Sequence, residues 1–412
     1  MHYFIFPSAD AWITSGSSQI DGTSFKDQNF GQDQILELKK HFQNNSFQFQ
    51  TRILLNFAGT GFNTMKGLVD DGTIPSDATY RLKLFEAQGN SDLSAEYTLA
   101  GFPLHQAWDE GTGKFNDDPK TTDGCSWRFR RNPEGAAPVS WSVGVNTIDL
   151  DDDGVEFIEY HASFGEASPT FGNVTGSDFI DADGDENGGV WIRDAAYKTS
   201  QTFNLESPDI NMDITNMTNR WLDSTIPNYG IILKFTGSQE TDETTFGKLK
   251  FFSKNTHTIY APRIEGQWDG HIPCTGDNTG SLPELDVTGN TDNHIYTIGL
   301  QEKYRETDVP KFRIGARKQF IQKSFTTSYN QVSSSFIPEG SGSYALVDVA
   351  TGEKVIDFSD NSKLSCDSKS NYFIEYMNGL YPDRTYKILI KVKYNDGQER
   401  IYDNDFEFKL VR

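Results

Sequence analysis

Apolar side chains recur at every second position through much of the chain, which is the spacing of a half-buried strand. In Tyr80–Glu86 (YRLKLFE), Tyr and the two Leu residues share one face, while Arg81 and Lys83 lie on the other. Helical periodicity is nearly absent. Gln34–Phe42 fits either a helix or a strand, and we prefer the strand because its apolar residues alternate. The other clear strands are predicted at Arg52–Phe57, Gly230–Phe235 and Tyr386–Tyr394.

The predicted strands are separated by turns rich in Gly, Asn and Asp, a pattern typical of β-sandwiches and jelly rolls. A chain of 412 residues exceeds the ~250–300 residues that one core usually serves, so we expect two domains. Residues 273–293 hold little to bury and read as a linker or a long loop. The expected domains are residues 1–272, with an insertion at about 112–200, and residues 294–412, where strands resume at His294–Leu300.

The formal net charge is −22, which repels phosphate backbones and anionic membrane surfaces. Nucleic acid and membrane are therefore not expected as partners. Such acidity suits cation binding, docking onto a basic partner or simply solubility, and all three remain open.

The cysteines and the N-terminus indicate folding in a reducing cytosol. Cys125, Cys274 and Cys366 are odd in number and far apart, which argues against a disulfide framework. Met1–Pro7 is apolar only briefly and lacks a basic region, so we expect no signal peptide. No stretch approaches the ~18 apolar residues of a membrane span.

Several segments of the first part resemble, in the right order, the DNRLRE-type jelly roll, a family akin to carbohydrate-binding modules. The resemblance covers roughly residues 3–272. Ala58 replaces an Asp that is usual in the family. The matching segments are Ser8–Ile13, Asn29–Gly31, Thr51–Phe57, Ile74–Leu82, Trp108–Thr112, Trp221–Leu222, Tyr229–Leu233, Phe251–Ser253 and Tyr260–Ile264.

Within these segments Asp10, Arg52, Trp108 and Glu110 form a polar and aromatic set of the kind that ties sandwich edges together. A buried Arg must be paired, and Asp10 is a reasonable partner for Arg52. The alternative is that Arg52 contacts a ligand.

The C-terminal part resembles an immunoglobulin or fibronectin type III sandwich. Gly379–Tyr386 matches the tyrosine corner, which implies that the Tyr386 hydroxyl returns to upstream backbone. Asn395–Gly397 is a strong hairpin turn, because Asp-Gly tolerates positive φ angles. We expect the last strand at Asp405–Val411. The fold class is therefore all-β: a jelly-roll sandwich with a long insertion, then an Ig-like sandwich.

A jelly roll followed by an Ig-like domain in one acidic chain resembles virion structural proteins of T4-like marine tailed phages. The resemblance implies a non-enzymatic component of the neck, baseplate or fibre-attachment region, made in the host cytoplasm and located in the virion. Its partners would be other virion proteins and further copies of itself. The alternative function is that of a non-catalytic carbohydrate-binding module protein.

One acidic loop in the insertion has the spacing of a calcium-binding loop. Asp183, Asp185 and Asn187 occupy positions one, three and five, Gly188 the sixth and Asp194 the twelfth. Asp replaces the usual Glu at the twelfth position, and no flanking helices are predicted. Calcium is therefore one reading, and a solvated turn is the other. We expect no other cofactor.

The remaining candidate chemistry favours binding over catalysis. The seven His residues show no zinc-ligand spacing, and neither a nucleophile elbow nor a phosphate-binding loop is present. Trp127, Trp141 and Trp191 fall in or near predicted loops, where they could stack on a sugar face. The alternative is that these three side chains pack in a hydrophobic core or at a protein–protein interface.

Overall fold

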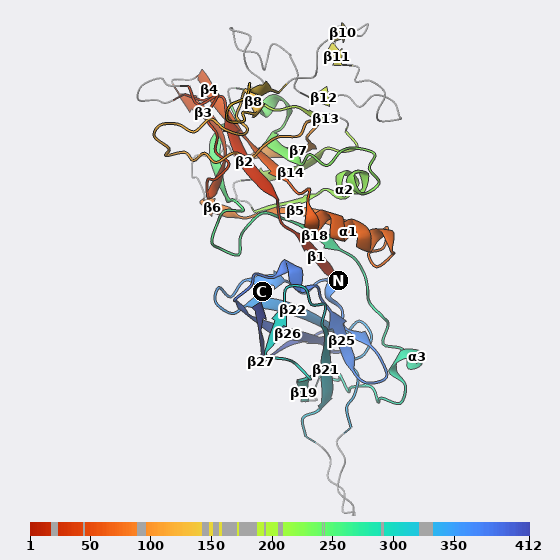
Figure 1. Ribbon diagram of the computed structural model, residues 1–412. Coiled ribbons are helices and arrows are strands. Elements are labelled where there is room, and N and C mark those ends of the chain that lie inside the picture. Colours follow the sequence, from red (N-terminus) through yellow and green to blue (C-terminus); the bar gives the residue numbers. More distant parts are fainter. Residues whose placement is uncertain are drawn as a thin grey trace, which may run out of the picture. The chain divides into compact units, whose positions relative to one another are not determined.

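The computed structural model confirms an all-β sandwich fold (Figure 1). It divides into two compact units, Ile5–Glu265 and Gly266–Arg412 with Met1–Phe4. The expected linker at 273–293 belongs to the second of these units. The structure describes residues 1–17, 24–43, 46–88, 96–141, 148–150, 156–158, 171–172, 188–192, 195–204, 209–240, 242, 244–289, 292–320 and 333–412.

Two larger sheets are formed by strands that lie wholly or partly in the unit Ile5–Glu265, ordered β1-β18-β5-β15 and β14-β7-β16-β4-β3-β17-β6, with β2 pairing β4 beside the second path. Three two-stranded sheets, β8-β9, β10-β11 and β12-β13, complete this unit. The strands of the larger sheets are β1 (His2–Ile5), β2 (Ala9–Thr14), β3 (Ile35–Gln43), β4 (Ser46–Asn56), β5 (Thr79–Leu84), β6 (Glu86–Gln88), β7 (Glu96–Pro103), β14 (Thr199–Asn204), β15 (Ile210–Asp213), β16 (Ile231–Phe235), β17 (Gly247–Phe252) and β18 (Arg263–Gln267). The short strands are β8 (Phe129–Arg131), β9 (Val139–Ser140), β10 (Ile148–Leu150), β11 (Glu156–Ile158), β12 (Phe171–Gly172) and β13 (Trp191–Ile192).

Alternation predicts the burial of these strands well. In β5 the side chains of Tyr80, Leu82 and Leu84 are buried, whereas Arg81 and Lys83, which alternate with them, are half-buried. The ambiguous segment Gln34–Phe42 is the strand β3, as preferred.

Two helices that the sequence pattern did not predict pack in this unit, α1 (Thr60–Asp70) and α2 (Thr215–Leu222). The α1 helix contains Gly61 and Gly67. Because glycine has a low helix propensity, the sequence pattern does not predict a helix here. The α1 helix buries Phe62 and Met65, which lie on one face, and the Phe62 ring meets the Trp221 ring of α2 edge-on at 6.3 Å. Tertiary packing therefore outweighs propensity here. None of the helices that the structure describes is long and apolar enough to span a membrane.

The second unit is a sandwich of a four-stranded sheet, β19-β21-β25-β24, and a five-stranded sheet, β20-β27-β26-β22-β23. Aromatic rings join the two sheets: Tyr344 stacks on Phe373 at 3.8 Å, and Phe312 lies 5.3 Å from Phe408. The strands are β19 (Asn293–Ile298), β20 (Lys303–Arg305), β21 (Lys311–Lys318), β22 (Gly342–Asp348), β23 (Lys354–Ile356), β24 (Ser365–Cys366), β25 (Asn371–Ile374), β26 (Thr385–Lys393) and β27 (Glu399–Val411). The short helix α3 (Gly276–Thr279) lies in the expected linker.

The tyrosine corner has the expected contact. The Tyr386 hydroxyl donates to the Tyr381 carbonyl at 3.2 Å and accepts from the Tyr381 N–H at 2.7 Å. The predicted hairpin turn joins β26 to β27, where the Tyr394 N–H donates to the Gln398 carbonyl at 2.7 Å and Gly397 has a φ of 84°. Both features fix the path into the last strand.

Candidate functional site

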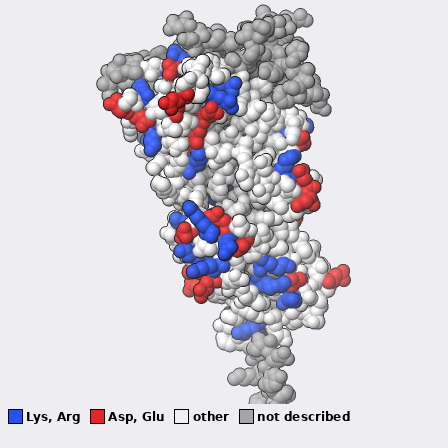
Figure 2. Space-filling view, viewed as in Figure 1, with Lys and Arg blue, Asp and Glu red and all other residues white. Residues whose placement is uncertain are grey.

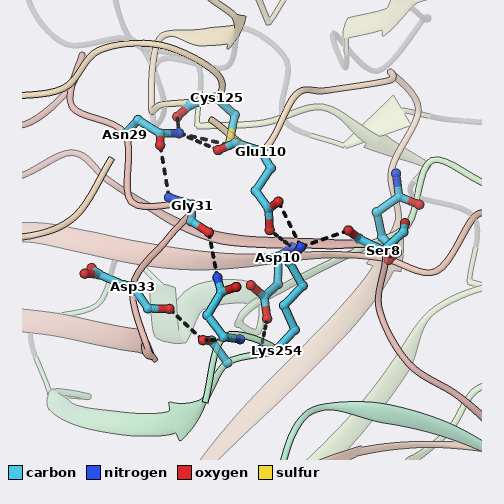
Figure 3. Close-up of polar contacts among 11 residues, drawn as sticks. Ser8, Asp10, Asn29, Gly31, Asp33, Glu110, Cys125 and Lys254 are labelled. Atoms are coloured by element: carbon cyan, nitrogen blue, oxygen red, sulfur yellow. Dashed lines mark hydrogen bonds and ion pairs between the residues drawn. The ribbon is translucent and has the colours of Figure 1, made fainter. Parts of the chain in front are cut away.

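Three charged side chains from distant parts of the sequence meet beside β2 (Figure 3). The Asp10 N–H donates to Glu110 Oε1 at 2.9 Å, and Glu110 Oε2 lies 2.9 Å from Lys254 Nζ. The Lys254 N–H donates to Asp10 Oδ2, and Lys254 Nζ donates to the Ser8 carbonyl at 3.0 Å. The structure therefore brings together Asp10 and Glu110, two of the predicted signature residues, and adds Lys254 from the segment after β17.

The Asp10 carboxyl is the most perturbed acid of this group. Burial raises its pKa to about 7; the Lys254 backbone hydrogen bond opposes the rise, and the nearby Glu110 carboxylate adds to it. Asp10 Oδ1 has no hydrogen-bond partner among the described residues. This carboxyl is therefore only partly ionised at neutral pH.

Asn29 holds the loop that carries Glu110. Its Nδ2 donates to the carbonyls of Glu110 at 2.6 Å and Cys125 at 2.7 Å. Its Oδ1 accepts from the N–H groups of Gly31 at 3.1 Å and Gly113 at 2.8 Å. A Cβ at Gly31 would lie 2.1 Å from the Glu110 carbonyl oxygen, so this close approach requires glycine. The contacts indicate a structural role for this network.

Trp108, another residue of the predicted signature set, also has a structural role. Its side chain is buried, and its Nε1 donates to the Tyr229 carbonyl at 3.0 Å.

Arg52 is fully buried, but the expected ion pair with Asp10 is wrong. Arg52 Nε and Nη2 each lie 2.8 Å from Glu240 Oε1, at the end of the short helix η1 (Gly237–Glu240). The strand register gives the reason: Arg52 lies opposite Ile13, whereas Asp10 lies opposite Leu55. Because successive residues point to opposite faces, Asp10 and Arg52 lie on different faces of the sheet.

Glu240 is shared by two buried cations. Its other oxygen pairs with Lys234 Nζ on β16, and the side chains of Arg52, Glu240 and Lys234 are 0%, 2% and 7% exposed. We call these three residues the buried ionic cluster. Burial lowers the Arg52 pKa, and the Glu240 carboxylate opposes that shift. The sequence carried one signal of this cluster, a Lys in the otherwise apolar strand GIILKF.

Tryptophan rings surround the buried ionic cluster. The Arg52 guanidinium lies 4.8 Å from the Trp127 ring and 5.1 Å from the Trp191 ring. Trp127, Trp141 and Trp191 are 1%, 1% and 3% exposed and belong to one core cluster. Their burial favours the core alternative, because a sugar could not reach the ring faces that pack in this core.

A surface groove that the sequence did not indicate lies beside β2 and β3. It has a volume of about 570 Å³, and at its edge the Phe115 side chain is 52% exposed. Its charged lining is balanced in sign. The residues that line it are Trp12, Gln32, Asp33, Gln34, Ile35, Glu37, Lys114, Phe115, Asn116, Asp117, Lys248 and Lys250.

Asp33 fixes the aromatic part of this groove. Its carboxylate accepts from Trp12 Nε1 at 2.9 Å and from the Phe115 N–H at 3.0 Å, while burial raises its pKa. The Trp12 ring stacks on Phe30 at 3.9 Å, and the Phe115 ring lies 6.1 Å from Trp12. Because Trp12 and Phe30 are only 4% and 1% exposed, Phe115 is the aromatic ring that this groove presents to solvent.

The proposed calcium residues Asp183, Asp185, Asn187 and Asp194 lie outside the described residues. Among the side chains that are described, no group of three His, Cys, Asp or Glu residues is arranged to hold a metal ion. Cys125 is buried, and burial raises the pKa of its thiol.

Comparison with known proteins identifies no family for this chain. No protein-family model matches the sequence, and no curated protein matches it. A solved structure, the adhesin domain of Epf from Streptococcus pyogenes, aligns over 100% of this chain and 92% of its own chain, with 8% sequence identity and a TM-score of 0.16. A score this low carries no argument about fold or function.

Proposed function

We propose that the protein is a non-catalytic structural component of a tailed-phage virion, in the neck, baseplate or fibre-attachment region. It acts by protein–protein assembly, as one of several copies. The order of a jelly-roll-like part and an Ig-like part in one acidic chain supports this proposal, as the sequence resemblance implies. The structural observation that supports this proposal most strongly is an open strand edge in the unit Gly266–Arg412.

That open edge belongs to β27. One side of β27 pairs with β26, whereas its other side pairs with β20 only at Lys409–Val411. No other strand that the structure describes pairs with that second side. Unpaired backbone groups on such an edge can accept a strand from another chain. A partner strand could add on either side of the bulge at Asp403–Asp405, where the register against β26 shifts and Asp405 has a φ of 53°.

Charge limits which partner the edge accepts. Asp403, Asp405 and Glu407 are exposed along β27, beside the 55%-exposed Ile401, and Asp403 is paired with Lys387 of β26 at 2.9 Å. Acidic side chains disfavour pairing of this edge with a second copy of itself, and they favour a basic strand. The exposed apolar Ile401 would then be covered on binding.

The acidity of the whole chain is uneven along the sequence. Residues 142–187 contain twelve Asp and Glu residues but neither Lys nor Arg. On the described surface of Figure 2, by contrast, both signs of charge are interspersed. This distribution supports docking of the chain onto a basic neighbour.

The proposal is tested by mass spectrometry and cryo-electron microscopy of purified particles from the phage that encodes the chain. We expect a fixed copy number and density that fits both sandwich units. A complete absence of the chain from purified particles would contradict the proposal.

A charge-reversal variant tests the role of the β27 edge. Asp403→Lys combined with Glu407→Lys should reduce incorporation of the chain into particles at least tenfold, because the edge loses its attraction for a basic strand. Asp70→Lys combined with Asp77→Lys, at two exposed residues in the other unit, is the matched control and should incorporate normally. Equal incorporation of both variants would exclude the β27 edge as the assembly surface.

The alternative function, carbohydrate binding without catalysis, is favoured by one specific observation: the groove at Phe115. Aromatic faces stack on sugar rings, and the carboxylate and amide groups of the lining can bind hydroxyls. The balanced charge of the lining suits a neutral glycan.

A glycan array with the purified chain tests this alternative. Phe115→Ala should abolish binding, whereas Phe246→Ala, which truncates another exposed Phe, should leave it unchanged. Uniformly negative arrays for the unaltered chain would contradict carbohydrate binding.

A further inference from the structure

Two cysteines that are far apart in sequence lie side by side in the unit Gly266–Arg412. Cys366 is the last residue of β24, and its cross-strand partner on β25 is Asn371. The Asn371 Nδ2 donates to Cys274 Sγ at 3.4 Å. One side chain therefore connects the position of Cys366 to the Cys274 sulfur.

The backbone confirms this placement. The segment that contains Cys274 runs along the outer side of β24, where the Cys366 N–H donates to the Ile272 carbonyl at 3.3 Å. The Ile272 N–H donates to Ser365 Oγ at 3.0 Å. The Cys274 N–H donates to Glu339 Oε2 at 2.6 Å, which anchors the segment from the other end.

The two thiols are also buried. Cys274 and Cys366 are 6% and 1% exposed; Cys274 Sγ donates to the Leu364 carbonyl at 3.6 Å, and Cys366 Sγ donates to the Asp367 carbonyl at 3.7 Å. The interaction between the two thiols is the largest cause of opposite pKa shifts, raising the Cys274 pKa and lowering the Cys366 pKa. Negative charge therefore develops more readily on the Cys366 sulfur.

We propose that Cys274 and Cys366 are a reversible oxidation site that forms an intramolecular disulfide in the presence of a peroxide. The Cys366 thiolate attacks one peroxide oxygen, the O–O bond breaks, and the protonated products are a sulfenic acid and water. The Cys274 sulfur then attacks the Cys366 sulfur, which forms the S–S bond and releases a second water. The two thiols lose two electrons, and one hydrogen peroxide is reduced to two waters.

The disulfide would fasten the segment before α3 to the sandwich. It would close a long loop of chain, and long closed loops restrict the unfolded state most. This inference does not depend on the proposed function. Cys125 provides an internal comparison, because its sulfur contacts the Glu110 carbonyl and Asn29 in the other unit.

The test uses the full chain, reduced and then treated with hydrogen peroxide, followed by alkylation in denaturant and intact mass measurement. We expect the oxidised chain to carry one alkyl group instead of three and, apart from those groups, to have lost two hydrogen atoms. Peptide mapping should show Cys274 linked to Cys366 and Cys125 alkylated. Dithiothreitol should restore three alkylated thiols.

Three variants separate the proposed pairing from other oxidation. Cys125→Ser should keep the linkage, whereas Cys274→Ser and Cys366→Ser should each abolish it. Because a Ser at either buried position could prevent folding, the mapping of the unaltered chain decides the matter by itself. Three alkylated thiols after peroxide, a linkage through Cys125, or sulfinic acid at Cys366 without a linkage would overturn the proposal.

Discussion

The buried ionic cluster contains two cations and one carboxylate, and this imbalance gives a prediction that can be measured. Glu240→Gln removes the carboxylate that Arg52 and Lys234 share, and the two buried cations then repel each other. Arg52→Met instead leaves Lys234 paired with Glu240, while the Met side chain occupies part of the vacated space. We therefore expect Glu240→Gln to destabilise the chain more than Arg52→Met.

The magnitudes follow from the burial and contacts of the cluster. Removing one partner from a buried ion pair costs about 3–5 kcal/mol, which we assign to Glu240→Gln because all three side chains are at most 7% exposed. Arg52→Met loses its two contacts with Glu240 Oε1, the hydrogen bond to the Gly188 carbonyl and the contacts with two Trp rings. These losses amount to roughly 1–3 kcal/mol.

Urea unfolding followed by Trp fluorescence is the appropriate assay. Six of the seven Trp residues lie in Ile5–Glu265, so the signal reports mainly the unit that contains the cluster. The double variant completes a mutant cycle. We expect it to be less destabilised than the sum of the two single variants, because removing Arg52 relieves the repulsion that Glu240→Gln creates.

The ranking of the two single variants decides the outcome. If Arg52→Met costs as much as Glu240→Gln or more, the shared carboxylate does not balance the two cations, and the electrostatic reasoning fails. Strict additivity in the double variant would lead to the same conclusion.

Three further predictions concern single residues. Asp10 has a folded-state pKa of about 7, raised from 3.8, so its contribution favours folding below about pH 4 and is lost as the pH rises to about 7. The melting temperature of Asp10→Asn relative to the unaltered chain should therefore rise between pH 5 and pH 8, and a parallel pair of curves would contradict this. Tyr386→Phe should cost about 1–2 kcal/mol in urea unfolding, because two partly buried hydrogen bonds are lost; no change would mean that the tyrosine corner is dispensable. Gly31→Ala should cost about 1–3 kcal/mol, whereas Gly67→Ala in α1, where a Cβ meets no atom within 4 Å, should stabilise by about 0.5–1 kcal/mol; the reverse order would refute the close approach at Gly31.

The sequence predicts those features that depend on local spacing. Alternation in Tyr80–Glu86 and Gln34–Phe42 identifies β5 and β3, and the Tyr386 motif identifies a contact only five residues away along the chain. The burial of Arg52, on which its expected pairing depended, is confirmed.

The sequence does not predict features that depend on the register of distant segments. The Glu240 partner of Arg52 follows from a register that puts Ile13, and not Asp10, opposite Arg52. The groove combines Trp12, Asp33 and Phe115 from three separate segments, and the cysteine pair combines the expected linker with β24. The helix α1 is not predicted from the sequence, because the packing of Phe62, rather than helix propensity, stabilises it.

Assembly through an open strand edge is the central claim, and cross-linking mass spectrometry on purified particles tests it most directly. A reagent that couples carboxylates to lysines would report which proteins lie within reach of Asp403, Asp405 and Glu407. We predict reproducible cross-links from these residues to lysines of one neighbouring virion protein. Particles that contain the chain but give cross-links only from other surfaces would contradict the claim.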